Sequence, residues 1–132
     1  MNTQVESAFL AAVATLQAIS TIEKRTGVSE EENAPEDSRI IVHCQDCEHV
    51  TGPLWRATVA FRIETPAYDN ARATHETRLD AIRVWLDDKQ AVGAALQLQG
   101  MTVRGYHVQK STTSLEENRW IAEIEIVAGV DT

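Results

Sequence analysis

Residues 54–88 have the sequence LWRATVAFRIETPAYDNARATHETRLDAIRVWLDD, and this stretch decides the fold class. Its first part, residues 54–65, alternates strictly between apolar and polar side chains. Alternation with a period of two is typical of a strand with one face on a core and the other in water, as in an antiparallel sheet. Pro66 ends this predicted strand, because proline cannot donate a ladder hydrogen bond.

The second part of the stretch, residues 70–87, has the periodicity of an amphipathic helix. Its apolar stripe has spacings of 4, 4, 3 and 4 residues and consists of Ala71, His75, Leu79, Ile82 and Leu86, with Trp85 beside it. Positions at these spacings share one face of a helix. Asp69 precedes the stripe as an N-cap, since its carboxylate can accept a hydrogen bond from a first-turn amide. Residues 89–98 predict a further short helix, which Gly93 weakens.

Residues 4–25 predict a long N-terminal helix by the same reasoning. The stripe has spacings of 4, 3, 4 and 3 residues and consists of Val5, Phe9, Ala12, Leu16 and Ile19. Thr3 and Glu6 fit a capping box, in which each side chain satisfies an amide of the first turn. Lys24 and Arg25 suit the negative end of the helix dipole, and Gly27 can follow the helix end because it tolerates a positive φ.

Three further segments predict strands: residues 39–44 (RIIVHC), 101–110 and 119–128. The breaker Thr51-Gly52-Pro53 predicts that the strands over residues 39–44 and 54–65 form a hairpin with a long loop. Residues 111–118 (STTSLEEN) are polar and predict an open loop between the last two strands, longer than an ordinary hairpin tip.

The resulting element order is α-β-β-α-(α)-β-β. It predicts an α+β fold with an antiparallel sheet of about four strands, packed on one face by two main helices. A chain of 132 residues is enough for one domain, so we expect a single domain over residues 1–132. The apolar phases of the elements predict one core that contains Phe9, Leu16, Ile19, Val59, Phe61, Ile63, Leu79, Ile82, Leu86, Trp120, Ile124 and Ile126.

The chain is acidic, with 12 basic and 20 acidic residues and a net charge of −8. Residues 29–38 (SEEENAPEDS) hold five of the acids and no base, which predicts a solvated acidic loop or, alternatively, an acidic surface for a basic partner. This charge balance argues against binding of DNA, RNA or anionic lipid through bulk charge. The longest apolar run, residues 8–14, is far shorter than the ~20 residues of a membrane-spanning helix.

Residues 43–49 (HCQDCEH) form the one cluster with metal-ligand chemistry. His43, Cys44, Cys47 and His49 supply ligand atoms of the kind that zinc binds tetrahedrally. The spacing is poor, because structural zinc sites usually draw two ligands from a second, distant pair. In a regular strand the side chains of Cys44 and Cys47 also leave opposite faces. We therefore expect an ordinary strand end with free thiols and no metal, with a zinc site or a redox pair as the alternatives.

The remaining candidates favour packing over chemistry. His75 lies on an apolar stripe, which predicts a partly buried histidine with one hydrogen-bonded nitrogen; as an acid or base it would pair with Asp69 or Asp80. His107 lies mid-strand without an acidic neighbour in sequence. The three tryptophans fall on apolar faces and are expected to pack in the core: Trp55, Trp85 and Trp120. The sequence has no phosphate-binding loop and no serine-hydrolase elbow, so we expect no enzyme, no cofactor and no catalytic residue.

The element order and chain size resemble those of the small tail-terminator and tail-completion proteins of long-tailed bacteriophages. The likeness rests on the strand–turn–helix run of residues 54–88, which ends in a Leu-Asp pair, and on the helix predicted before it. It also rests on the terminal hairpin ending in NRWIAEIEIVAGV, residues 118–130. The HCQDCEH segment departs from the pattern, since the family implies a plain polar loop there.

The resemblance implies a structural virion protein without an active site. Such a protein forms a ring, usually a hexamer, that caps the tail tube and joins it to the head–tail connector. The implied partners are further copies of the chain, the tail tube protein and the connector proteins, without sequence-specific nucleic-acid binding and without a membrane. The implied location is the tail or neck of the virion, after synthesis in the bacterial host cytoplasm. The alternatives are another neck or head–tail adaptor protein, a small non-viral binding or assembly module, and a metal-binding protein that uses the HCQDCEH segment.

Overall fold

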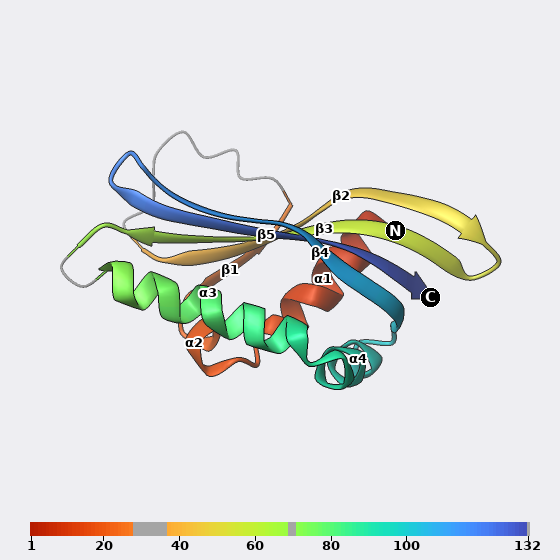
Figure 1. Cartoon of the computed structure of the whole chain (residues 1–132). Helices are drawn as coiled ribbons and strands as arrows, with labels where there is room; N and C mark the ends of the chain where they lie inside the picture. Colours follow the sequence, from red (N-terminus) through yellow and green to blue (C-terminus); the bar gives the residue numbers. More distant parts are fainter. Residues whose placement is uncertain (28–36, 69–70, 132) are drawn as a thin grey trace.

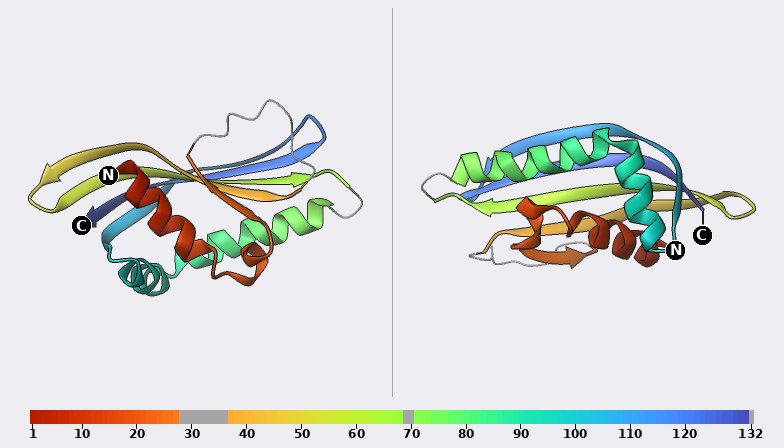
Figure 2. Two further views of the ribbon diagram at one scale, coloured as in Figure 1. Left: turned by 180° about the vertical axis from the view of Figure 1, so that it is seen from behind. Right: turned by 90° about the horizontal axis from the view of Figure 1, so that it is seen from below.

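The computed structural model describes residues 1–27, 37–68 and 71–131. Its elements are α1 (Asn2–Val13), α2 (Gln17–Ser20), β1 (Glu23–Thr26), β2 (Arg39–Thr51), β3 (Leu54–Pro66), α3 (Ala71–Asp87), α4 (Lys89–Leu98), β4 (Thr102–Glu116) and β5 (Arg119–Asp131). The strands form one sheet in the order β1-β2-β3-β5-β4, and the helices lie on one of its faces (Figure 1, Figure 2). The predicted α+β class is therefore confirmed.

The sheet has five strands and is mixed, where the sequence predicted about four antiparallel strands. The additional strand, β1, pairs with β2 in parallel, from Glu23 opposite Arg39 to Thr26 opposite Val42. All other neighbouring pairs, β2–β3, β3–β5 and β4–β5, are antiparallel. The period-two alternation of β3 predicted antiparallel pairing, and this prediction is confirmed.

The predicted helix over residues 4–25 is wrong in its second half. The first helix ends at Val13, and the backbone becomes extended at Leu16 (φ −69°, ψ 133°) before the short helix α2. The hydroxyl of Thr15 donates to the carbonyl oxygen of Ala12 over 2.8 Å at this break. Short hydroxyl side chains compete with the helical backbone in this way. The turn lets Ile19, which is fully buried, enter the core from a new direction.

The residues expected at the C-terminal end of that helix form β1 instead. The ammonium group of Lys24 nevertheless reaches back and donates to the carbonyl oxygens of Ser20 (2.7 Å) and Ile22 (2.9 Å). Gly27 has the predicted positive φ (87°), but it follows a strand, and its amide donates to the carbonyl oxygen of Val42.

The predicted capping box is also wrong. The N-cap of α1 is Met1, and no side chain caps the helix. Glu6 is buried and points to β2, where its carboxylate accepts the main-chain amide of Cys44 over 2.8 Å. Asn2, one helical turn earlier, donates its side-chain amide to the carbonyl oxygen of Cys44 over 3.3 Å. The helix thus takes the place of a neighbouring strand at the edge of β2, just where β1 has ended.

The helices predicted over residues 70–87 and 89–98 are confirmed as α3 and α4. Asp88 caps α4, because its carboxylate accepts the amide of Ala91 over 3.1 Å. Gly93 lies within α4 and does not interrupt it. The predicted N-cap Asp69 and most of the acidic segment 29–38 lie outside the described residues.

Both hairpins are longer and tighter than predicted. β2 runs on through the HCQDCEH segment to Thr51, which leaves Gly52 and Pro53 as the hairpin tip. β4 runs on to Glu116, so most of the predicted loop 111–118 is strand. The turn there consists of Glu117 and Asn118, both with positive φ (49° and 63°). Consecutive positive φ values are the signature of a type I′ turn, whose twist matches that of the two strands.

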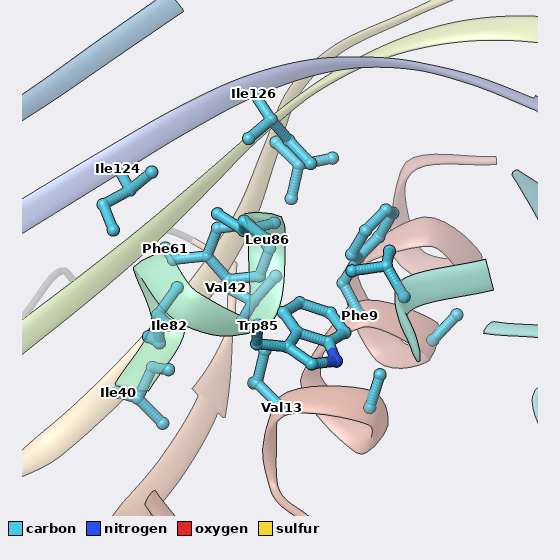
Figure 3. Close-up of a cluster of buried hydrophobic side chains, with 14 of the residues drawn as sticks. Phe9, Val13, Ile40, Val42, Phe61, Ile82, Trp85, Leu86, Ile124 and Ile126 are labelled. Atoms are coloured by element: carbon cyan, nitrogen blue, oxygen red, sulfur yellow. The ribbon is translucent and has the colours of Figure 1, made fainter. Parts of the chain in front are cut away.

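The core lies between the sheet and the helices (Figure 3). Phe61 on β3 is its centre, with edge-on ring contacts to Phe9 of α1 (5.8 Å) and Trp85 of α3 (6.3 Å). The predicted core residues are buried except Leu16 and Trp120, which are half-buried. Trp55 is half-buried against the core as well, at the far end of β3.

Candidate functional site

The HCQDCEH segment lies on β2, beyond the part of the strand that β1 covers. A bulge between Cys44 and Asp46 shifts the register of β2 against β3. As a result Cys44 pairs with Val59 and Cys47 pairs with Ala57, and both partners point into the core. The expectation that the two cysteines leave opposite faces is therefore wrong, because a bulge inserts one residue into the alternation.

The two histidines of the segment are engaged elsewhere. His43 lies on the opposite face from Cys44, with its Nδ1 atom 3.1 Å from the carboxylate of Glu6. The Nε2 atom of His49 is 2.8 Å from the carbonyl oxygen of Gly52, and its ring contacts Trp55 edge-on at 5.1 Å. Among residues 1–27, 37–68 and 71–131, no three His, Cys, Asp or Glu side chains are grouped so that they could hold a metal ion.

Both thiols are weak acids in this environment. Burial, together with the neighbouring Cys47 and Glu6, raises the pKa of Cys44 to about 12. Burial also raises the pKa of Cys47, which is more exposed than Cys44. A reactive cysteine has a lowered pKa, so the raised pKa values of this pair disfavour the thiolate form that redox or nucleophilic chemistry uses.

The sequence predicted a partly buried His75 with one hydrogen-bonded nitrogen, whereas the residue is only 1% exposed on α3 and both ring nitrogens lie near a hydroxyl group. Its Nδ1 atom is 3.0 Å from the hydroxyl of Thr65 on β3, and its Nε2 atom is 3.4 Å from the hydroxyl of Thr113 on β4. Burial lowers the pKa of His75, and the guanidinium of Arg78 lowers it further. Neither Asp80 nor another carboxylate is hydrogen-bonded to the ring among the described residues, and Asp69 is not among them. The geometry supports a structural tie between helix and sheet.

The tryptophans divide between packing and surface contacts. Trp85 is buried in the core. Trp120 is half-buried at the end of the sheet, where the ring of His75 lies 6.2 Å away and the guanidinium of Arg72 lies 5.4 Å from its centroid. A cation over an indole face stabilises the docking of the first turns of α3 on the sheet.

The sheet face that points away from the helices carries a charged cluster. Arg39 and Glu64 form an ion pair at 2.9 Å, and each side chain is only 2% exposed. Glu64 also accepts from Arg62 (2.7 Å) and pairs with Arg119 on the neighbouring strand. Removing one member of a buried pair costs about 3–5 kcal/mol, since the other charge is left uncompensated. The cluster fixes the ends of β2, β3 and β5 relative to one another.

The same face is hollowed near the tip of the β2–β3 hairpin. The hollow has a volume of about 320 Å³ and apolar walls formed by Val50, Leu54 and Val127. Its charged or titratable lining residues are Arg56, Tyr106 and His107, and none of them is a carboxylate. His107, which the sequence left without a partner, is exposed there on β4. Sequence reasoning missed this hollow, because it requires three strands in register.

At the opposite end of the sheet, the β4–β5 hairpin tip is exposed. Leu115 pairs with Trp120 across the hairpin and is 55% exposed, although its side chain is large and apolar. Glu116 and the turn residue Glu117 follow it, and both are exposed. An exposed leucine followed by two acids is a surface feature that own-chain packing does not explain.

The fold is similar to that of a chain in a solved structure described as the virion of a native gene transfer agent particle. The match covers 99% of this chain and 96% of that chain, with a TM-score of 0.54 and 15% sequence identity. At this identity the likeness establishes a shared fold. No protein-family model and no curated protein matches the sequence. None of the described helices is long and apolar enough to cross a membrane.

Proposed function

We propose that this chain is a structural virion protein, and that it acts as a tail terminator. In this role, copies of the chain form a ring that caps the tail tube and joins it to the head–tail connector. The ring order that we propose is a hexamer. The observation that carries the proposal is the fold likeness to a chain of a phage-like virion, which extends over nearly the full length of both chains. The element order and the strand–turn–helix pattern of residues 54–88 support the same assignment.

The exposed parts of the sheet suit contacts between subunits. β4 is the outermost strand of the sheet, is 15 residues long and is exposed along most of its length. A long edge strand presents main-chain N–H and C=O groups with which another chain can form hydrogen bonds. The β2–β3 hairpin extends beyond the helical layer (Figure 1, Figure 2). A contact between two different surfaces, repeated about an axis, closes into a ring.

The charge of the chain is compatible with a conduit for DNA. Its net charge is −8, so a ring of such subunits presents an acidic assembly to the duplex. A negative lumen repels phosphate groups and does not retain the passing DNA. The proposal accordingly includes no nucleic-acid binding, and its partners are further copies of the chain, the tail tube protein and the head–tail connector.

The proposal assigns no catalytic role. The histidine that sequence reasoning considered as an acid or base, His75, is buried between Thr65 and Thr113. The cysteine pair has raised pKa values. The features that sequence reasoning singled out for chemistry are thus used in packing.

The test is removal of the chain from cells that produce the particles, followed by electron microscopy. A tail terminator stops growth of the tube, so we expect tails of irregular length that are separate from full heads. Resupply of the wild-type chain is the control and restores joined particles. Uniform tails without heads point to the neighbouring head–tail adaptor role instead. Normal-length tails joined to full heads contradict both roles.

A further inference from the structure

The hollow near the β2–β3 tip has a floor made of two glycines on neighbouring strands. Gly129 of β5 lies between Arg56 of β3 and Gly105 of β4 in the same row of the sheet. The rows on either side carry Leu54 and Val127, whose side chains form the walls. The hollow is therefore deep because two residues of this row, Gly105 and Gly129, have no side chain.

Neither φ nor steric fit requires glycine at either position, and only Gly105 stands next to a register shift of its strand. Neither Gly105 nor Gly129 has a positive φ. A Cβ atom on Gly129 would meet its nearest neighbour, Cδ1 of Leu54, at 3.6 Å, and a Cβ atom on Gly105 would meet nothing within 4 Å. The first is an ordinary van der Waals distance, and the second position is open space. Glycine within a strand weakens it and often marks the close approach of another backbone or ligand.

The β4–β5 tip lies at the other end of the molecule, and its exposed Leu115 forms a knob of a kind that the hollow could receive. Leu115 pairs with Trp120, which pairs with Thr65 near the end of β3, whereas the hollow lies at Leu54, where β3 begins. β3 is 13 residues long, so the tip of one chain cannot reach its own hollow. A contact between the two sites needs a second copy.

The two sites are complementary in polarity and charge. The tip presents the exposed Leu115 beside Glu116 and Glu117, and the hollow presents apolar walls beside Arg56 and His107. Arg56 is paired with Glu48 in the isolated chain, but both side chains are more than half exposed. Such exposed ion pairs contribute little stability, so Arg56 can change its partner at low cost.

We propose that the β4–β5 tip of one copy docks in the glycine-floored hollow of the next copy, with Leu115 between Leu54 and Val127. The contact joins two different surfaces, so it propagates head to tail around a ring. This inference rests on the proposed function and specifies the subunit contact of the ring.

A photo-crosslink tests the contact directly. We replace Leu115 with p-benzoylphenylalanine and mix this chain with an isotope-labelled wild-type chain, at concentrations where the wild type associates. The expected product joins position 115 to the peptide around Gly105 or Gly129 of the differently labelled chain. The control places the same photo-reactive residue at Val84, which is 69% exposed on α3, and is expected to give no such product. Crosslinks from position 115 to any other region contradict the proposal.

Filling the hollow provides the second measurement. Gly129→Leu is expected to raise the concentration for half-maximal assembly about tenfold or more, because a side chain then occupies the place of the knob. Gly93→Leu on α4 is the matched control, since a Cβ atom there meets nothing within 4 Å, and it leaves assembly unchanged. Circular dichroism establishes that both variants fold. Normal rings with Gly129→Leu overturn the docking and leave the proposed function standing. A wild-type chain that neither associates nor occurs in particles overturns the proposed function itself.

Discussion

The carboxylate of Glu6 on α1 accepts the main-chain amide of Cys44 on β2 over 2.8 Å, so a helix satisfies the open edge of a strand. The sheet edge passes from β1 to α1 at this point, because β1 covers β2 only as far as Val42. Edge strands are commonly blunted by a covering element, and here Glu6 and Asn2 of α1 bind the main chain of β2. This explains why an acidic residue occupies the inner face of α1.

The first prediction follows from this contact. Glu6→Ala leaves the amide of Cys44 buried without its acceptor, which costs about 1–3 kcal/mol of unfolding free energy. Glu6→Gln keeps a carbonyl acceptor and should lose less. Urea denaturation followed by circular dichroism measures both. Gln4→Ala, at an exposed position of the same helix, is the control and should be close to wild type. Equal stabilities of Glu6→Ala and wild type contradict the edge-capping role.

The second prediction concerns the core. Phe61 and Ile82 are 1% and 0% exposed, and Phe61 contacts aromatic rings from two helices. Replacing either residue with alanine is expected to cost about 2–5 kcal/mol, from lost apolar contacts and the cavity that remains. Val84→Ala, at a position that is 69% exposed on α3, should change stability little. A loss below 1 kcal/mol for Phe61→Ala in denaturant unfolding contradicts this account of the core.

How far the sequence predicts the fold depends on whether a pattern is local. α3 and α4 follow from periodicity within one segment, and both appear with the predicted bounds to within a residue or so. β1 (EKRT) has no apolar alternation, and its existence depends on parallel pairing with β2, which is distant in sequence. The polar strand end 111–116 resembles a loop because most of it is exposed on both faces. Tertiary pairing decides these segments.

The candidate sites also divide into features that a local pattern predicts and features that depend on tertiary pairing. The burial of His75 follows from its place on a helical stripe, but its two threonine partners come from β3 and β4. The facing of Cys44 and Cys47 depends on a bulge, for which the sequence has no glycine or other local sign. The hollow at Gly105 and Gly129 requires the register of three strands, so no single segment predicts it.

The third prediction is a pH dependence that originates at His75. Its pKa is lowered in the folded chain, mainly by burial, with Arg78 lowering it further and Glu76 raising it slightly. The unfolded chain therefore binds more protons than the folded chain below about pH 6.5, and stability falls as the pH decreases through that value. Thr65 and Thr113, which also face the ring, do not titrate in this range.

His75→Gln removes the titrating group and is expected to flatten this part of the stability profile. Urea denaturation between pH 5 and pH 8 measures the profile of each chain. His107→Gln is the control, because His107 is exposed, and its profile should follow the wild type. A His75→Gln profile as steep as that of the wild type contradicts the assignment.

The fourth prediction concerns the thiols. Burial raises the pKa of Cys44 to about 12, so its thiolate fraction near pH 8 is very small. Cys47 is more exposed and should react first with a thiol reagent, whereas Cys44 reacts only as the chain opens. Mass spectrometry of partly labelled protein measures the order, and Cys47→Ser should abolish the fast phase. The purified chain is also expected to hold no zinc, and about one zinc per chain that is lost in Cys47→Ser contradicts this.

The last prediction tests the β4–β5 tip in assembled particles. Deleting residues 111–118 is a poor test, because most of them belong to β4 and the sheet would be damaged. Glu116→Lys with Glu117→Lys reverses the charge of the tip and keeps the strand and turn, since both side chains are exposed. Like charges then face Arg56 across the proposed contact, and mispaired charges oppose association.

We expect particles made with this double variant to have fewer joined heads and tails, and the purified chain to associate more weakly than wild type as salt is lowered, because screening no longer reduces the repulsion. The matched control is Glu76→Lys with Asp80→Lys, which makes the same change in net charge on α3, where both side chains are more than half exposed. If both double variants impair joining equally, net charge is the cause and the tip has no special role. If the tip variant alone fails, and association of the purified chain recovers in high salt, the defect lies in an electrostatic contact at the tip.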